Sequence, residues 1–172
     1  MSILNRLNGG DFRSIGDSGQ VAADVLVAPS LFAELFAGLT HSNALIRMRA
    51  ADAVEKVTAA RPDLLQPFKS RLLKEVAATN QQEVRWHVAL MIPRLALTRS
   101  ERREAIEILK GYISDKSSIV KTFSMQALAD LSQQDESLKP EIISLLEELT
   151  RTGTPAMQSR GKKLLKAFNR NS

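Results

Sequence analysis

A small set of aromatic and basic side chains carries the binding chemistry that this sequence offers. Trp86 is the only Trp among the 172 residues, and His87 follows it directly. An indole ring is a frequent anchor in protein interfaces and also stacks on nucleobases, while cationic side chains bind carboxylates and phosphates. The candidate partner-binding residues combine these two types: Arg49, Lys56, Trp86, His87, Arg94, Arg160 and Lys163.

Residue sets typical of catalysis or of metal binding are scarce. The chain has two His and no Cys, and neither His41 nor His87 has another His, Cys or carboxylate at a spacing typical of metal ligands. The pair Gly9-Gly10 is not flanked by a predicted strand, so it does not match a phosphate-binding loop. We therefore expect a protein that is not an enzyme and that uses no metal, no cofactor and no small-molecule substrate.

The net charge of +5 is unevenly distributed along the chain. Residues 151–172 contain six Lys and Arg and no Asp or Glu, whereas residues 133–150 contain five acidic residues and one Lys. A basic terminal helix either keeps the end of a protein soluble or attracts an acidic partner or nucleic acid. The sequence leaves both interpretations open.

Apolar residues recur at a spacing that predicts an internal repeat. Leu39, Val76, Ile113 and Leu149 are separated by 37, 37 and 36 residues, and each ends a short helical apolar pattern. A second helical pattern opens about seven residues after each of them. Two helices per unit, repeated four times, predict an all-α solenoid, because a unit of this size cannot bury its apolar face alone. The expected repeats cover about 30–61, 62–97, 98–138 and 139–170.

The N-terminal region differs from the repeats. Residues 1–19 contain four Gly and no periodic pattern, which predicts an irregular lead-in with one helical turn over residues 3–7. Residues 20–28 are mostly apolar and predict a short helix that caps the repeats, so that residues 20–172 form a single domain.

Two local signals predict helix boundaries within the repeats. Thr98 and Glu101 match a capping box, in which each side chain bonds a free N–H at a helix start. Pro93 interrupts an apolar helical pattern, and its missing N–H and its ring predict a kink near Ala89.

The second helix of each predicted repeat opens with a recurring pair, an aliphatic residue followed by a basic one. The three clear copies are Ile46-Arg47, Val84-Arg85 and Val120-Lys121, and the fourth copy, Met157-Gln158, lacks the basic residue. Over residues 30–168 this pattern resembles the HEAT and HEAT-like repeats of the armadillo superfamily. The resemblance implies a right-handed α-solenoid whose second helices line the concave side. It also implies that the basic residue of each pair packs between repeats and bonds a neighbouring carbonyl or acid.

Such solenoids mostly serve as binding scaffolds, so the resemblance implies a scaffold whose concave face docks a protein segment. The basic candidate residues favour an acidic segment. The alternative is a nucleic-acid-binding protein that contacts the phosphate backbone, distantly like HEAT-like DNA alkylation-repair glycosylases. Those enzymes use aromatic residues and an Asp on the concave face, and no matching motif is present here. Two roles are equally compatible with Trp86: its ring anchors a partner, or it packs between two successive repeats.

No segment of the sequence predicts a membrane span or an export signal. A span needs about 18 or more apolar residues in a row, and no such run occurs. The N-terminal MSILNRLNGG has neither a basic start nor an apolar stretch with a small-residue cleavage site. We expect a cytoplasmic protein without membrane contact.

Overall fold

The computed structural model describes residues 2–170, and most of them are helical. Nine α-helices and no strand occur in this range, and 81% of the structure is helix. None of the helices described is long and apolar enough to cross a membrane. The chain divides into two compact units, Met1–Ala96 and Leu97–Ser172. The single domain predicted for residues 20–172 therefore stays a prediction, and residues 1, 171 and 172 of the predicted ranges lie outside the described residues.

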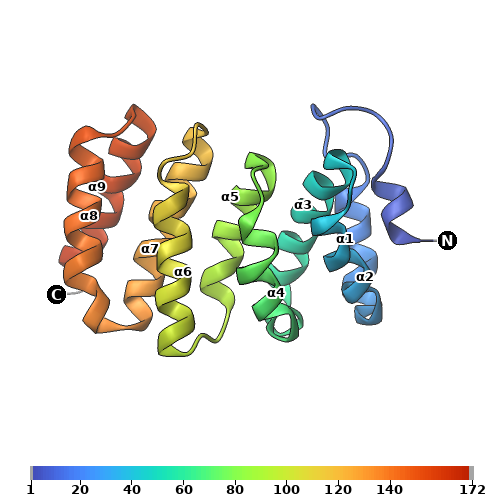
Figure 1. The fold of residues 1–172 in the computed structure, drawn as a ribbon, viewed down its shortest axis with the longest axis horizontal. Helices are drawn as coiled ribbons and strands as arrows, with labels where there is room; N and C mark the ends of the chain where they lie inside the picture. The colour runs from blue at the N-terminus through green and yellow to red at the C-terminus, as the bar shows by residue number, and fades with distance from the viewer. Residues whose placement is uncertain (1, 171–172) are drawn as a thin grey trace. The chain divides into compact units, whose positions relative to one another are not determined.

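The first unit is built around α3, which packs against α1, α2 and α5 (Figure 1). Its core contains large side chains that are fully buried, including Leu35, Phe36 and Leu72. Its 3-10 segments are η1 (Ile3–Leu7), η2 (Pro29–Leu31), η3 (Gly38–Thr40), η4 (Pro62–Phe68), η5 (Val76–Ala78) and η6 (Ile92–Arg94). Its α-helices are α1 (Ser18–Val27), α2 (Phe32–Ala37), α3 (Ala44–Ala60), α4 (Lys69–Lys74) and α5 (Gln82–Met91).

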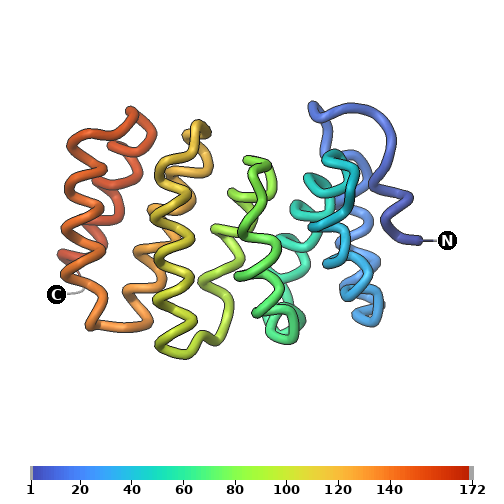
Figure 2. Tube along the Cα trace, in the orientation of Figure 1, coloured from blue at the N-terminus to red at the C-terminus, as the bar shows by residue number. Residues whose placement is uncertain are grey.

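The second unit consists of two antiparallel helix pairs, which the tube in Figure 2 traces from yellow to red. Its elements are α6 (Arg99–Tyr112), α7 (Ser118–Gln134), η7 (Glu136–Leu138), α8 (Lys139–Thr152) and α9 (Pro155–Arg170). The helix α7 contacts α6, α8 and α9, so it forms the centre of this unit. Its Met125 and Leu128 are fully buried, as is Leu109 of α6.

The local predictions are confirmed at some boundaries and wrong at one. Thr98 and Glu101 form the predicted capping box at the start of α6, and the turn over residues 3–7 is present as a 3-10 helix. The predicted N-terminal helix is α1, which begins two residues earlier than expected. The kink predicted near Ala89 is wrong, because α5 ends at Met91 and a 3-10 turn carries Pro93. A proline without an N–H is better accommodated at the start of that turn than inside an α-helix.

Gly161 of α9 lies in close contact with α8. A Cβ atom at this position would lie 1.8 Å from Thr150 Oγ1, and that hydroxyl donates to the Leu146 carbonyl at 2.6 Å. Gly161→Ala gains up to about 1 kcal/mol of helix propensity, but we expect overpacking to lower the free energy of unfolding by about 1–3 kcal/mol. Urea unfolding measures the difference.

The matched control for this substitution is Gly111→Ala in α6. A Cβ atom at Gly111 would meet no other atom within 4 Å, so helix propensity alone predicts a neutral or slightly stabilising effect. If the two variants were equally stable, the close packing of α8 on α9 at Gly161 would be contradicted.

Candidate functional site

The seven predicted partner-binding residues fall into both units. Arg49 and Lys56 lie on α3, Trp86 and His87 on α5, and Arg94 in η6, so these five belong to the first unit. Arg160 and Lys163 lie on α9 of the second unit. We describe a pocket in the first unit and a basic helix face in the second.

The prediction that Arg49 is exposed for binding is wrong. The residue is only 3% exposed, and its guanidinium is enclosed by the lead-in segment that precedes α1. It donates to four backbone carbonyls, those of Leu7 at 2.9 Å, Gly9 at 2.6 Å, Asp11 at 3.2 Å and Ser14 at 3.1 Å. Arg49 therefore anchors the lead-in to α3 and is not available to a partner.

Glycines allow the lead-in to wrap around this guanidinium. Gly9, Gly10 and Gly16 all have positive φ angles, of 88°, 78° and 55°, a backbone region that favours glycine. At Gly16 an added Cβ would also lie 2.8 Å from the Arg49 Cζ atom. The segment that the sequence predicted to be irregular is thus a loop shaped around one buried side chain.

Lys56 and Arg94 are engaged in contacts within the first unit. Lys56 Nζ lies 2.6 Å from Asp52 Oδ2. Arg94 donates to the Glu55 carbonyl at 2.8 Å and to Thr58 Oγ1 at 2.9 Å, and it also pairs with the Glu55 carboxylate. The prediction that Lys56 and Arg94 present free positive charges to a partner is therefore wrong, because carboxylates of α3 neutralise both side chains.

Asp52 forms the centre of a polar cluster between α1, α3 and α5. Its Oδ2 accepts from the Ser18 hydroxyl at 2.5 Å as well as from Lys56, and its Oδ1 lies 3.8 Å from His87 Nε2. Burial disfavours the charged carboxylate, but its contacts with His87, Lys56 and Ser18 outweigh burial and hold the pKa of Asp52 well below its usual range. Asp52 is therefore ionised at neutral pH.

His87, predicted to bind a partner, is instead a buried structural residue. It is 9% exposed, its Nδ1 lies 2.6 Å from the Glu83 carbonyl one turn earlier on α5, and Trp86 Nε1 lies 3.4 Å from its Nε2. Trp86 itself is half-buried. Trp86 therefore keeps part of its ring accessible to a ligand.

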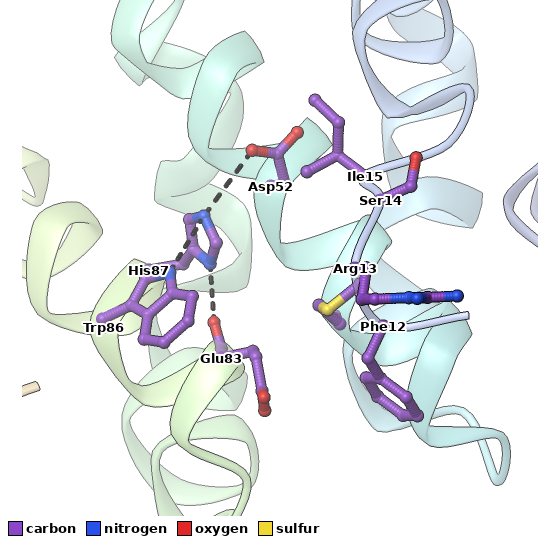
Figure 3. Close-up of a pocket in the computed structure, with 9 residues that line it drawn as sticks. Phe12, Arg13, Ser14, Ile15, Asp52, Glu83, Trp86 and His87 are labelled. Atoms are coloured by element: carbon purple, nitrogen blue, oxygen red, sulfur yellow. Dashed lines mark hydrogen bonds and ion pairs between the residues drawn. The ribbon is translucent and has the colours of Figure 1, made fainter. Parts of the chain in front are cut away.

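A pocket of about 270 Å³ opens beside Trp86 (Figure 3). Three segments line it: the lead-in, α3 and α5. The lining residues are Phe12, Arg13, Ser14, Ile15, Met48, Asp52, Glu83, Trp86 and His87. Residues 12–15 were not among the predicted binding residues, although Phe12 and Ile15 are large apolar residues within a glycine-rich polar segment. In the structure they are 54% and 49% exposed.

The second candidate site is the outer face of α9. Lys162, Lys163, Lys166 and Arg170 are exposed, and none of them has an ion pair within residues 2–170. Arg160 is half-buried and donates to Gln126 Oε1 of α7 at 2.9 Å. Lys163 is thus exposed as expected, while Arg160 is partly used by the packing of α9 on α7.

Arg160 also lies near a half-buried carboxyl group on α7. Burial raises the pKa of Asp130, although the Gln126 amide and the charge of Arg160 both oppose the shift. The positive charge of Arg160 therefore stabilises the ionised form of a carboxyl group within the second unit, in addition to any partner it could bind.

Two of the basic residues at the helix starts make the predicted hydrogen bonds to neighbouring carbonyls, while their predicted packing between repeats stays a prediction. Arg47 donates to the carbonyls of His41 and Ser42 and to Gln81 Oε1. Arg85 donates to the Thr79 carbonyl at 2.7 Å and to Asn80 Oδ1. Lys121 makes no comparable bond within residues 2–170.

Within the described part of the chain, no group of three or more His, Asp or Glu side chains is arranged to hold a metal ion. The chain matches no protein-family model, no curated protein and no solved structure.

Proposed function

We propose that this chain is a non-enzymatic protein-binding scaffold whose basic helix α9 docks an acidic protein segment. The proposed scaffold is a right-handed α-solenoid of about four HEAT-like repeats. The spacing of the apolar pattern supports it, and so do the antiparallel pairs α6–α7 and α8–α9, in which the second helices α7 and α9 contact each other. That arrangement is typical of successive two-helix repeats.

One observation carries the proposed binding role, the cluster of unpaired cations on α9. Successive residues of a helix are turned by about 100°, so Lys162, Lys163, Lys166 and Arg170 lie within one arc of about 100°. Residues 151–170 contain no acid that could pair with them locally. Several like charges on one face attract an oppositely charged segment and accelerate its association.

The three basic candidates of the first unit are already engaged by groups of that unit. Arg49 donates to backbone carbonyls, and Lys56 and Arg94 pair with carboxylates of the same unit. An acidic segment would gain little there, because each cation already has its partners. We therefore propose that the basic side chains of α9 form the surface that binds the acidic segment.

Nucleic acid is the second candidate partner, and the same unpaired cations favour it. Phosphate contacts would need only these charges, and the aromatic residue of α9, Phe168, is buried and cannot stack on a base. Binding of this kind would be independent of sequence and steeply dependent on salt, with each neutralised phosphate adding about 0.9 to the salt slope on duplex DNA.

Fluorescence anisotropy of labelled ligands tests these proposals. We expect an Asp/Glu-rich peptide to bind the full chain, and the double variant K162E/K166E to weaken that binding roughly tenfold at low salt, about 0.7 kcal/mol for each reversed charge. The matched control is K74E/K116E, which changes the net charge equally at two exposed lysines elsewhere. Its affinity should stay within about twofold of the parent chain, because a site on α9 does not involve those residues.

Each alternative outcome has a defined meaning. Equal weakening by both double variants would contradict a site on α9 and would indicate attraction by net charge alone. Salt-sensitive binding of a mixed-sequence DNA duplex, without binding of the acidic peptide, would support the nucleic-acid candidate and overturn the protein-binding proposal.

A further inference from the structure

The pocket beside Trp86 differs from α9 in the charge that it presents. Among its lining residues, the cation Arg13 is 90% exposed and pairs with Asp11 at 2.5 Å. In Figure 3 its guanidinium points away from Asp52 and His87. The lining also contains two carboxylates, those of Asp52 and Glu83. An anionic ligand would therefore meet negative charge in this pocket.

Glu83 is the lining residue whose charge is not neutralised. Its carboxylate has no ion pair within residues 2–170, and its hydrogen bond from the Gln82 amide is long, at 3.4 Å. In the view of Figure 3 the Glu83 side chain extends away from Asp52 and His87 and lies between Trp86 and Phe12. A cation bound between the two rings would reach this carboxylate.

Asp52, the other carboxylate of the lining, is already engaged within the first unit. Its Oδ2 accepts from Ser18 and Lys56, and its Oδ1 lies 3.8 Å from His87 Nε2. Lys56 neutralises its charge, so Glu83 is the carboxylate that the pocket offers to a cation.

Aromatic and aliphatic side chains provide the walls. Trp86 faces the pocket from α5, and Phe12 and Ile15 face it from the lead-in, with more than half of Phe12 exposed. The face of an indole ring attracts cations. With about 270 Å³, the pocket is smaller than most sites for drug-sized ligands, which span about 300–1,000 Å³. Its size suits one long side chain.

We infer that this pocket binds the guanidinium group of an arginine side chain from a partner protein. Guanidinium fits better than an ammonium group, because its planar fork can donate two hydrogen bonds to the Glu83 carboxylate while its flat face stacks on Trp86. The inference goes beyond the proposed function, since the pocket lies in the first unit and takes a charge opposite to that of a ligand for α9.

Trp86 makes the test direct, because it is the only Trp and its fluorescence reports on the pocket. The probes are two blocked tripeptides, acetyl-Gly-Arg-Gly-amide and the same peptide with citrulline, which keeps the shape of arginine without its charge. We expect saturable quenching or a spectral shift of Trp86 in the full chain with the arginine peptide. The citrulline peptide should bind roughly 10-fold to 100-fold more weakly, the range for losing a hydrogen bond to a charged group.

The decisive variant is Glu83→Gln, which removes the unpaired charge and leaves every bond to Asp52 in place. It should weaken arginine-peptide binding roughly tenfold or more, whereas the matched control Glu104→Gln on the exposed face of α6 should leave it unchanged.

Three results would overturn the inference: equal affinity for the citrulline peptide, no effect of Glu83→Gln, or no saturable response of Trp86 at all. The variant K162E/K166E should bind the arginine peptide like the parent chain, because α9 does not line the pocket. Loss of acidic-peptide binding on α9 and loss of arginine binding in the pocket are therefore separable outcomes.

Discussion

Replacing Arg49 by Met is expected to detach the lead-in from α3 and to lower the free energy of unfolding by about 3 kcal/mol or more. The guanidinium donates to four carbonyls of residues 7–14, and hydrogen bonds to charged groups each contribute about 1.5–3 kcal/mol. The total falls below the sum, because the freed carbonyls of the loop can turn to water. Urea unfolding measures the loss, and limited proteolysis should cleave residues 8–17 faster in the variant.

Two substitutions bracket this effect. Arg49→Lys keeps the charge but loses the planar fork, so it should recover only part of the stability. Arg13→Met removes an arginine of the same loop that is 90% exposed, and we expect a change within about 0.5 kcal/mol. If Arg49→Met were as mild as Arg13→Met, the structural role of Arg49 would be refuted. Because the lead-in carries Phe12 and Ile15, Arg49→Met should also abolish the response of Trp86 to the arginine peptide.

Replacing Leu109 by Ala is the second change with a large expected effect, about 2–5 kcal/mol of lost unfolding free energy. Leu109 is completely buried on α6, which packs against α7 in the second unit. The substitution leaves a cavity that a close-packed interior fills only in part. Thermal or urea unfolding of the full chain, followed by far-UV circular dichroism, would measure the loss.

Lys110→Ala is the control for the helix phase. Lys110 follows Leu109 and is turned about 100° around the helix, which by periodicity alone would leave it facing water. Its ammonium instead lies 2.5 Å from Glu141 of α8 and 3.2 Å from Glu107, and these contacts raise the pKa of Lys110. The side chain is 31% exposed, and pairs of this kind contribute at most about 1 kcal/mol. A loss at Lys110 as large as that at Leu109 would mean that the predicted register of α6 is wrong.

The helical periodicity of the sequence determined much of the core. Leu35, Leu72 and Leu109 occupy equivalent places in the apolar pattern, and all three are fully buried. Leu145, the fourth member of this series, is only half-buried. Helix formation and capping depend on residues within a few positions of one another, so the sequence predicts them directly. The capping box of Thr98 and Glu101 is one example.

The exposure of the candidate site residues was decided only by the tertiary structure. Arg49 is buried because carbonyls 35 to 42 residues earlier in the chain fold over it, and Arg94 is neutralised by Glu55, 39 residues away. Periodicity indicates which face of a helix is apolar, but not which distant segment covers its polar face. The pocket beside Trp86 exists for the same reason: a glycine-rich loop with no periodic signal is held against α3 by one buried arginine, and the charges left unpaired there depend on that contact.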